Sequence, residues 1–178
     1  MERIHLIIGV ITWFIFVMAA SSETRDERNS LTQNERIVTL TLLGEARGEG
    51  SAGIYAVACV LQKRMKERYK TPAEVCLEPW QFTIWNAGKG KVKKESELYY
   101  LWDSDCSVVL YASKMAKVVC SNSRMIQAYT GHANHYYSTD RKTPPYWTYK
   151  KLKKDGKIIK VPIKPTMKIG KHIFYKLP

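Results

Sequence analysis

The chain has 178 residues and carries 29 lysines and arginines against 16 acidic residues, a formal net charge of +13. This length suits one domain, and a hydrophobic content of 45% is ordinary for a globular core, so several large domains and a wholly disordered chain are excluded. Such a positive charge is typical of proteins that bind nucleic acid, anionic cell walls or anionic membranes, and it is also consistent with plain solubility.

The N-terminus predicts export. Residues 4–20 are almost unbroken apolar, Arg3 precedes them, and small residues occupy positions 19–22. This pattern predicts a secretory signal peptide over residues 1–20, with an uncleaved membrane anchor as the alternative, because about 17–25 apolar residues cross a bilayer. Residues 21–30 are polar and charged and predict a flexible lead-in. We therefore expect a secreted or cell-envelope protein with no nucleic-acid partner and with affinity for anionic walls or membrane surfaces.

A helix is predicted over residues 31–43, because Thr32 and Glu35 fit a capping box and apolar residues then recur at helical spacing. The glycine-rich segment 44–50, with the sequence GEARGEG, follows directly. A helix that ends on Glu45 inside such a turn is a rigid mount for a general acid. The glycines let a substrate approach the backbone closely.

The rest of the chain predicts further helices and then a small sheet. Helices are expected over residues 51–69, 71–76 and 103–120, the last capped by Asp103 or Ser104. Residues 80–90, which are aromatic and then glycine-rich, predict a loop. The β-prone segments are 135–137, 157–161 and 172–175, and Asp155-Gly156 is a hairpin signal. This order predicts an α+β domain.

Four cysteines stand at positions 59, 76, 106 and 120, with no CxxC pair that would indicate structural zinc. Two disulfides are possible in an oxidising compartment, with three connectivities. Cys59 is equally consistent with a small buried core residue, because it lies in the middle of a predicted helix.

Four segments, in the same order along the chain, resemble a known family. They are GEARGE with the following small-residue helix at 44–64, PWQFTIWN at 79–86, GHANHYY at 131–137 and IGKHIFY at 169–175. They resemble the SleB/CwlJ-type cell wall hydrolases, the catalytic domains of spore cortex-lytic enzymes and of related bacterial and phage muralytic proteins. The resemblance implies a lysozyme-like α+β catalytic domain over residues 31–178, with N-terminal helices and a small C-terminal β-sheet.

The resemblance also implies an activity. The enzyme is expected to cleave peptidoglycan between N-acetylmuramic acid and N-acetylglucosamine, as a lytic transglycosylase or a muramidase, without a cofactor. Glu45 is then the single general acid and base. Glycoside cleavage needs a protonated carboxyl group, and apolar neighbours keep a glutamate protonated by raising its pKa. Without the resemblance, the sequence favours the alternative that Glu45 is a solvent-exposed glutamate at a helix end with no catalytic role.

Two neighbours of Glu45 have alternative roles. Glu49 either contacts the substrate or accepts hydrogen bonds from the start of the next helix, where an anion suits the helix dipole. Arg47 is expected to pair with a carboxylate and hold the turn.

A sugar cleft is expected from aromatic and amide side chains. Its candidate residues are Gln81, Phe82, Trp85, Asn86, His135 and Tyr136. Aromatic faces stack on pyranose rings and amides bond their hydroxyl and acetamido groups. Phe82 and Trp85 are three residues apart, so the alternative is one apolar face of a short helix, which we favour for Phe82.

Two other functions stay open. His132, His135 and His172, with a nearby glutamate, are candidate metal ligands of a metallohydrolase, although Gly131 and the aromatic residues around it favour a loop or strand over the helix that the spacing suits. A non-catalytic wall-binding protein that uses the basic residues 141–176 is the other alternative, and an intact Glu45 argues against it.

Overall fold

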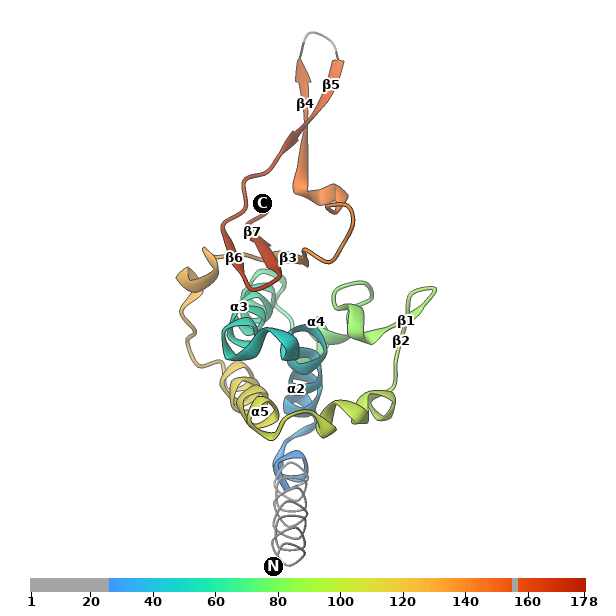
Figure 1. Ribbon diagram of the computed structural model, residues 1–178, viewed down its shortest axis with the longest axis vertical. Coiled ribbons are helices and arrows are strands. Elements are labelled where there is room, and N and C mark those ends of the chain that lie inside the picture. Colours follow the sequence, from blue (N-terminus) through green and yellow to red (C-terminus); the bar gives the residue numbers. More distant parts are fainter. Residues whose placement is uncertain (1–25, 155–156) are drawn as a thin grey trace, which may run out of the picture.

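The computed structural model describes residues 26–154 and 157–178 (Figure 1). The predicted signal peptide lies outside these residues. Residues 26–30, which the sequence places in a flexible lead-in, are helical, and Glu27 pairs with Lys117 at 2.8 Å. None of the helices in the described ranges combines the length and the apolar composition that a membrane span requires.

The helical body contains all four predicted helices. Its helices are α2 (Gln33–Ala46), α3 (Gly50–Arg68), α4 (Pro72–Leu77) and α5 (Cys106–Cys120). The capping box of Thr32 and Glu35 is present at the start of α2, and Thr71 with Glu74 forms a second one before α4. These boxes satisfy backbone N–H groups that have no partner within the helix.

The start of α5 differs from the prediction. Asp105, not Asp103 or Ser104, is the N-cap, and its carboxylate accepts hydrogen bonds from the first turn of α5. The 3₁₀ helix η3 (Glu95–Asp103) precedes it, with Asp103 as its last residue and Ser104 as its C-cap.

Helix α2 is the centre of the core. It contacts α3, α4, α5 and η3. Its residues 37–43 are all buried, so the helix is apolar on nearly every side, as expected of a central helix. The two buried threonines in this run, Thr39 and Thr41, satisfy their hydroxyls by donating to the carbonyls of Glu35 and Ile37.

Small antiparallel sheets accompany the helices, one of them before α5 and the other two after it, which confirms the α+β class. Their strands are β1 (Asn86–Gly88), β2 (Lys91–Val92), β3 (His135–Ser138), β4 (Tyr149–Lys154), β5 (Lys157–Pro162), β6 (Met167–Ile169) and β7 (His172–Tyr175). The three-stranded sheet has the order β3-β7-β6 and packs on α3 through Ala56, Val60 and Phe174. Strands β4 and β5 form a separate hairpin that projects from the body (Figure 1), and the predicted turn at 155–156 lies outside the described residues.

Short 3₁₀ helices connect these elements. They are η1 (Arg47–Glu49), η2 (Thr83–Trp85), η4 (Gln127–Thr130) and η5 (Tyr146–Thr148). The predicted loop over residues 80–90 therefore contains η2 and β1.

The cysteines do not form two disulfides, because Cys59, Cys76 and Cys120 carry free thiols. Burial raises the pKa of Cys59 to about 11 and that of Cys76 to about 12. Both are therefore unreactive core residues, as the alternative for Cys59 predicted.

Candidate active site

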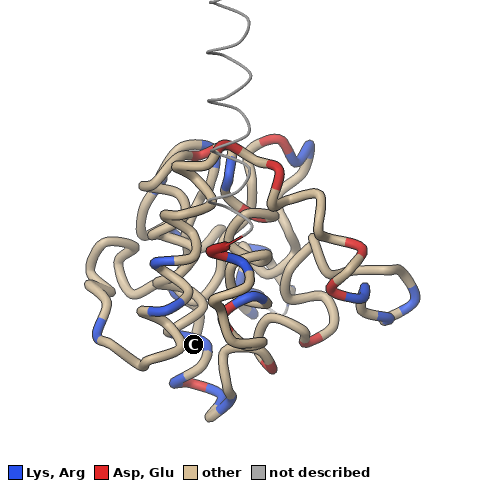
Figure 2. The backbone as a smooth tube through the Cα atoms, turned by 90° about the horizontal axis from the view of Figure 1, so that it is seen from below, with Lys and Arg blue, Asp and Glu red and all other residues tan. Residues whose placement is uncertain are grey.

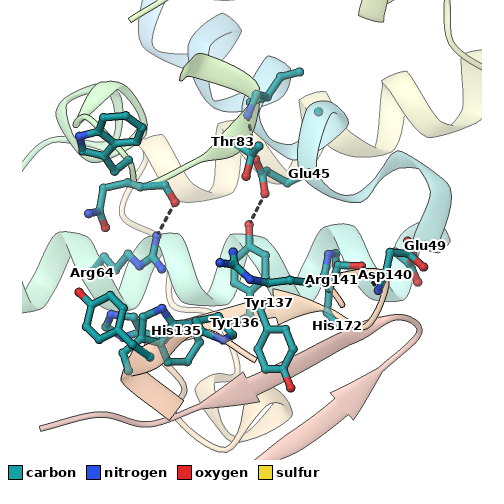
Figure 3. Close-up of a pocket in the computed structure, with 18 of the residues that line it drawn as sticks. Glu45, Glu49, Arg64, Thr83, His135, Tyr136, Tyr137, Asp140, Arg141 and His172 are labelled. Carbon is teal, nitrogen blue, oxygen red and sulfur yellow. Dashed lines mark hydrogen bonds between the residues drawn. The ribbon is translucent and has the colours of Figure 1, made fainter. Parts of the chain in front are cut away.

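A pocket of about 870 Å³ lies where the end of α2, the middle of α3, residues 80–84 and strand β3 meet. Figure 3 shows Glu45 between two groups of side chains, Arg64 with His135 on one side and Glu49 with Asp140 on the other. The lining residues that carry charge are Glu45, Glu49, Arg64, Lys93, Asp140 and Arg141. The pocket is thus elongated about a central carboxyl group.

The carboxyl group of Glu45 is fixed by two hydrogen bonds. Its Oε1 accepts the N–H of Ile84 at 3.1 Å, and its Oε2 accepts the hydroxyl of Tyr136 at 3.0 Å. Gly44 makes the first bond possible, because a Cβ at this position would overlap the Ile84 side chain. The glycine before the glutamate therefore serves the close approach of residues 83–84 to α2.

The surroundings of Glu45 favour a proton on its carboxyl group. Burial raises the pKa of Glu45 above its usual value, while the hydrogen bonds from Ile84 and Tyr136 and the charge of Arg64 act in the opposite direction. The same group thus has an environment that retains the proton and partners that stabilise the anion once the proton leaves. This combination suits an acid that later acts as a base.

Tyr136→Phe is expected to move the alkaline limb of the pH–rate profile to higher pH. In the wild type, the hydrogen bond from Tyr136 lowers the pKa of Glu45. The variant lacks this bond, so the pKa of Glu45 rises and the acid stays protonated to higher pH. Wall lysis measured across pH checks this. Tyr137→Phe is the control, since Tyr137 lines the pocket without bonding Glu45. An unchanged limb in Tyr136→Phe would contradict this role of the hydroxyl.

Arg64 is a buried cation that the sequence analysis missed. Its Nε donates to the carbonyl of Asn134 at 2.8 Å, its Nη1 donates to the carbonyl of Gln81 at 3.4 Å, and its guanidinium lies over the Phe82 ring. No ion pair joins it to a carboxylate within the described ranges. Arg64 thus connects two walls of the pocket. The available signal was its helical spacing from Ala56 and Val60, which face the same sheet.

Glu49 holds a turn of the sheet. Its Oε2 accepts the N–H of Lys171 at 2.8 Å, and Gly170 before it leaves room for this carboxylate. Glu49 stands at the N-cap of α3, yet its side chain makes no capping hydrogen bond, so the predicted contact with the helix start is wrong. The carboxylate does line the pocket, so the other predicted role of Glu49, contact with the substrate, remains a prediction.

Arg47 has no carboxylate partner among the described residues and donates instead to the carbonyl of Leu43, which corrects its predicted pairing.

Two histidines line the pocket as neutral rings. Burial and the charges of Arg64 and Arg68 lower the pKa of His135 to about 4. Burial also lowers the pKa of His172, whose ring meets the Tyr136 ring at 5.0 Å. Across residues 26–154 and 157–178, no three His, Cys, Asp or Glu side chains gather into a metal-binding group, so the metallohydrolase alternative lacks a donor set there.

The predicted sugar cleft is partly corrected. Gln81, His135 and Tyr136 do line the pocket. Phe82 and Trp85 are 1% and 2% exposed and belong to the core, so they do not form a sugar-binding surface.

Asn86 is not among the lining residues and instead accepts the N–H of Trp80 at 3.2 Å. The aromatic residues that the analysis missed are Trp80, Tyr137, Tyr146 and Trp147.

The chain is similar to a known protein family and to two solved structures. Residues 48–175 match the family model described as Cell Wall Hydrolase. The catalytic domain of the germination-specific lytic transglycosylase SleB from Bacillus anthracis is 27% identical, with 83% of this chain and 98% of that chain covered and a TM-score of 0.49. The catalytic domain of the Bacillus cereus SleB protein is also 27% identical, with coverages of 83% and 94% and a TM-score of 0.44. No curated protein sequence matches the chain.

Proposed function

This chain belongs to the cell wall hydrolase family, and from that premise we propose that it cleaves peptidoglycan glycan strands with Glu45 as general acid and then base. The bond cleaved is the one between N-acetylmuramic acid and N-acetylglucosamine. The family match begins at residue 48, so the role of Glu45 rests on the pocket itself. The observation that carries it is a partly buried carboxyl group, held by Ile84 and Tyr136, at the centre of an elongated pocket.

In the proposed reaction, protonated Glu45 gives its proton to the glycosidic oxygen while the bond to the muramic acid carbon breaks. The carboxylate that remains is stabilised by the N–H of Ile84, the hydroxyl of Tyr136 and the charge of Arg64. It then takes a proton from the hydroxyl group that attacks the same carbon.

The attacking hydroxyl group comes either from water or from the muramic acid itself. A hydrolase needs a second carboxyl about 5–5.5 Å from the acid when it retains configuration and about 6.5–9.5 Å away when it inverts. The other carboxylates that line the pocket both interact with Lys171, Glu49 through its backbone N–H and Asp140 through its ammonium group at 3.2 Å. Glu45 is thus the pocket carboxyl that is not tied to Lys171, and a single acid of this kind favours attack by the tethered 6-hydroxyl of muramic acid, which is already positioned.

We therefore expect 1,6-anhydro muropeptides in a digest of purified sacculi. Mass spectrometry of the products checks this. Products heavier by one water, with muramic acid ends that borohydride reduces, would instead identify a muramidase and call for an activated water.

One assay separates the proposed function from its rivals. The protein without residues 1–20 is incubated with purified sacculi, with and without a chelator, and release of soluble fragments is followed. Release that the chelator leaves unchanged supports the glutamate mechanism. Release that EDTA stops and zinc restores supports the metallohydrolase, and binding without release supports a non-catalytic wall-binding protein.

The hairpin of β4 and β5 is proposed to hold the enzyme on anionic walls or membrane surfaces, and the predicted export would place it there. Lys151 stands opposite Lys160 in the ladder. Like charges directly opposite each other are destabilising, so an anionic partner would relieve a repulsion that the free hairpin carries. Other lysines and arginines are spread along the backbone (Figure 2), so a test must distinguish position from total charge.

Wall binding is expected to weaken as salt rises, because exposed charges are screened over about 8–10 Å at physiological ionic strength. Glutamine at Lys150, Lys151, Lys153 and Lys160 should reduce sedimentation with sacculi while cleavage of small soluble fragments persists. The control carries glutamine at four exposed lysines elsewhere, Lys66, Lys89, Lys91 and Lys114. Equal losses in both variants would show that total charge, not the hairpin, matters.

A further inference from the structure

Two aromatic side chains of the pocket are exposed and have no ring partner. Trp80 is 66% exposed and Tyr146 is 89% exposed, and both line the pocket. By contrast Tyr136, Tyr137 and Trp147, which also line it, each pack against other rings. Neither Trp80 nor Tyr146 has such a contact with any ring of the described residues. Their faces are therefore available to a molecule in the pocket.

Trp80 has a backbone conformation that is unfavourable for a bulky residue. The N–H of Gln81 bonds the carbonyl of Glu78, which closes a turn with Pro79 second and Trp80 third. The φ of Trp80 is +68°, the value that a type II turn requires at its third position and that glycine normally supplies. Asn86 fixes this conformation by accepting the N–H of Trp80 at 3.2 Å. A bulky residue held in this region is a genuine outlier, and such strain clusters at functional sites.

The segments that carry Trp80 and Tyr146 meet the same end of the pocket. Trp80 adjoins Gln81, whose carbonyl accepts a hydrogen bond from Arg64. Tyr146 adjoins Trp147, whose ring centre lies 5.2 Å from that of His135. Arg64 and His135 lie together on one side of Glu45 (Figure 3). The two exposed rings are therefore carried by separate segments that both meet the Arg64 side of the pocket.

We propose that Trp80 and Tyr146 form an aromatic clamp that binds a pyranose ring of the glycan strand on the Arg64 side of Glu45. This inference rests on the proposed function, because it assigns part of the same pocket to the same substrate. The flat rings match the apolar C–H faces of a pyranose, and burial of those faces stabilises the complex. Held there, the sugar places the neighbouring glycosidic bond next to the carboxyl group of Glu45.

The test uses Trp80→Gly and Tyr146→Ala in a Glu45→Gln background, which prevents turnover. Isothermal titration calorimetry measures binding of peptide-free glycan strands prepared from sacculi. Each change should weaken binding about tenfold, as loss of about 50 Å² of apolar contact predicts. In the active protein the same changes should raise KM and leave kcat close to its original value.

Thermal unfolding separates binding from folding. Trp80→Gly should unfold at the same temperature as the parent or higher, since glycine adopts a φ of +68° without strain. Tyr69→Ala is the matched control, because Tyr69 is 96% exposed, has a φ of +54° and lies outside the pocket lining. It should bind glycan as the parent does.

The outcomes distinguish the clamp from the proposed function. If the wild type cleaves sacculi, and Trp80→Gly and Tyr146→Ala both bind glycan as tightly as the Glu45→Gln parent, the clamp is wrong and the function stands. A parent that binds no glycan strand also overturns the clamp. If Glu45→Gln still cleaves sacculi, the proposed function fails independently of either ring.

Discussion

Glu45→Gln is expected to abolish wall lysis and to leave the fold intact. The amide keeps the size of the side chain, and its oxygen still accepts the N–H of Ile84, but it has no proton to give to a glycosidic oxygen. Loss of a general acid lowers the rate by roughly 10²–10⁴-fold. Release of soluble fragments from sacculi measures the effect, and near-wild-type release would show that the acid is another group.

The stability of the same variant offers a second readout. The pKa of Glu45 is raised in the folded protein, so its contribution to stability is present below the unfolded pKa and is lost as pH rises through the folded pKa. Glutamine does not ionise. Glu45→Gln should therefore match the wild type at acidic pH and exceed its melting temperature at neutral and alkaline pH.

Glu49→Gln is the comparison for Glu45→Gln. Its amide oxygen can still accept the N–H of Lys171 and preserve the turn between β6 and β7. We expect a smaller loss of activity than in Glu45→Gln. An equal loss would make Glu49 a second catalytic carboxyl and would favour hydrolysis by water over internal capture.

Local signals in the sequence were sufficient to predict that the helices exist. The capping boxes at Thr32 and Thr71 are contained in four consecutive residues each, and the structure has both. The start of α5 was wrong because Asp103, Ser104 and Asp105 are all acceptable caps, and only packing decides among them. Local rules therefore predict that a helix exists better than they predict where it begins.

The pocket was harder to predict because it is made by contacts between distant segments. Tyr136 reaches Glu45 across 91 residues, and Arg64 reaches Asn134 across 70. A family resemblance supplied Tyr136, which stands in a matching segment. For Arg64 the local signal is its helical spacing from Ala56 and Val60, but its burial depends on the sheet that packs against α3.

The aromatic residues of the segment 79–86 show the limit of residue type as evidence. Trp80 and Trp85 are chemically identical and five positions apart, yet one is 66% exposed at the pocket and the other 2% exposed in the core. The turn at Trp80 directs its side chain outward, whereas η2 directs Trp85 toward α2. Trp85 was predicted for the sugar cleft because residue type alone does not reveal this reversal.

Trp85→Ala is accordingly expected to act on stability and not on sugar binding. The indole N–H donates to the hydroxyl of Thr41 at 2.8 Å inside the core, and Thr41 is fully buried. Removal of a buried tryptophan costs about 3–5 kcal/mol of the free energy of unfolding, a large share of the roughly 5–15 kcal/mol that holds a domain together. Urea unfolding followed by circular dichroism measures the loss.

Trp85→Phe separates the two parts of that effect. Phenylalanine fills much of the cavity but removes the indole N–H that donates to Thr41, whose hydroxyl still donates to the carbonyl of Ile37. The lost hydrogen bond costs about 0.5–1.5 kcal/mol. We expect its unfolding midpoint to fall between those of the wild type and Trp85→Ala. At a temperature where both variants are folded, their KM for soluble glycan should equal that of the wild type. A variant of Trp85 that keeps its unfolding free energy but loses glycan affinity would return this residue to the sugar cleft. That result would contradict the burial of its ring against α2.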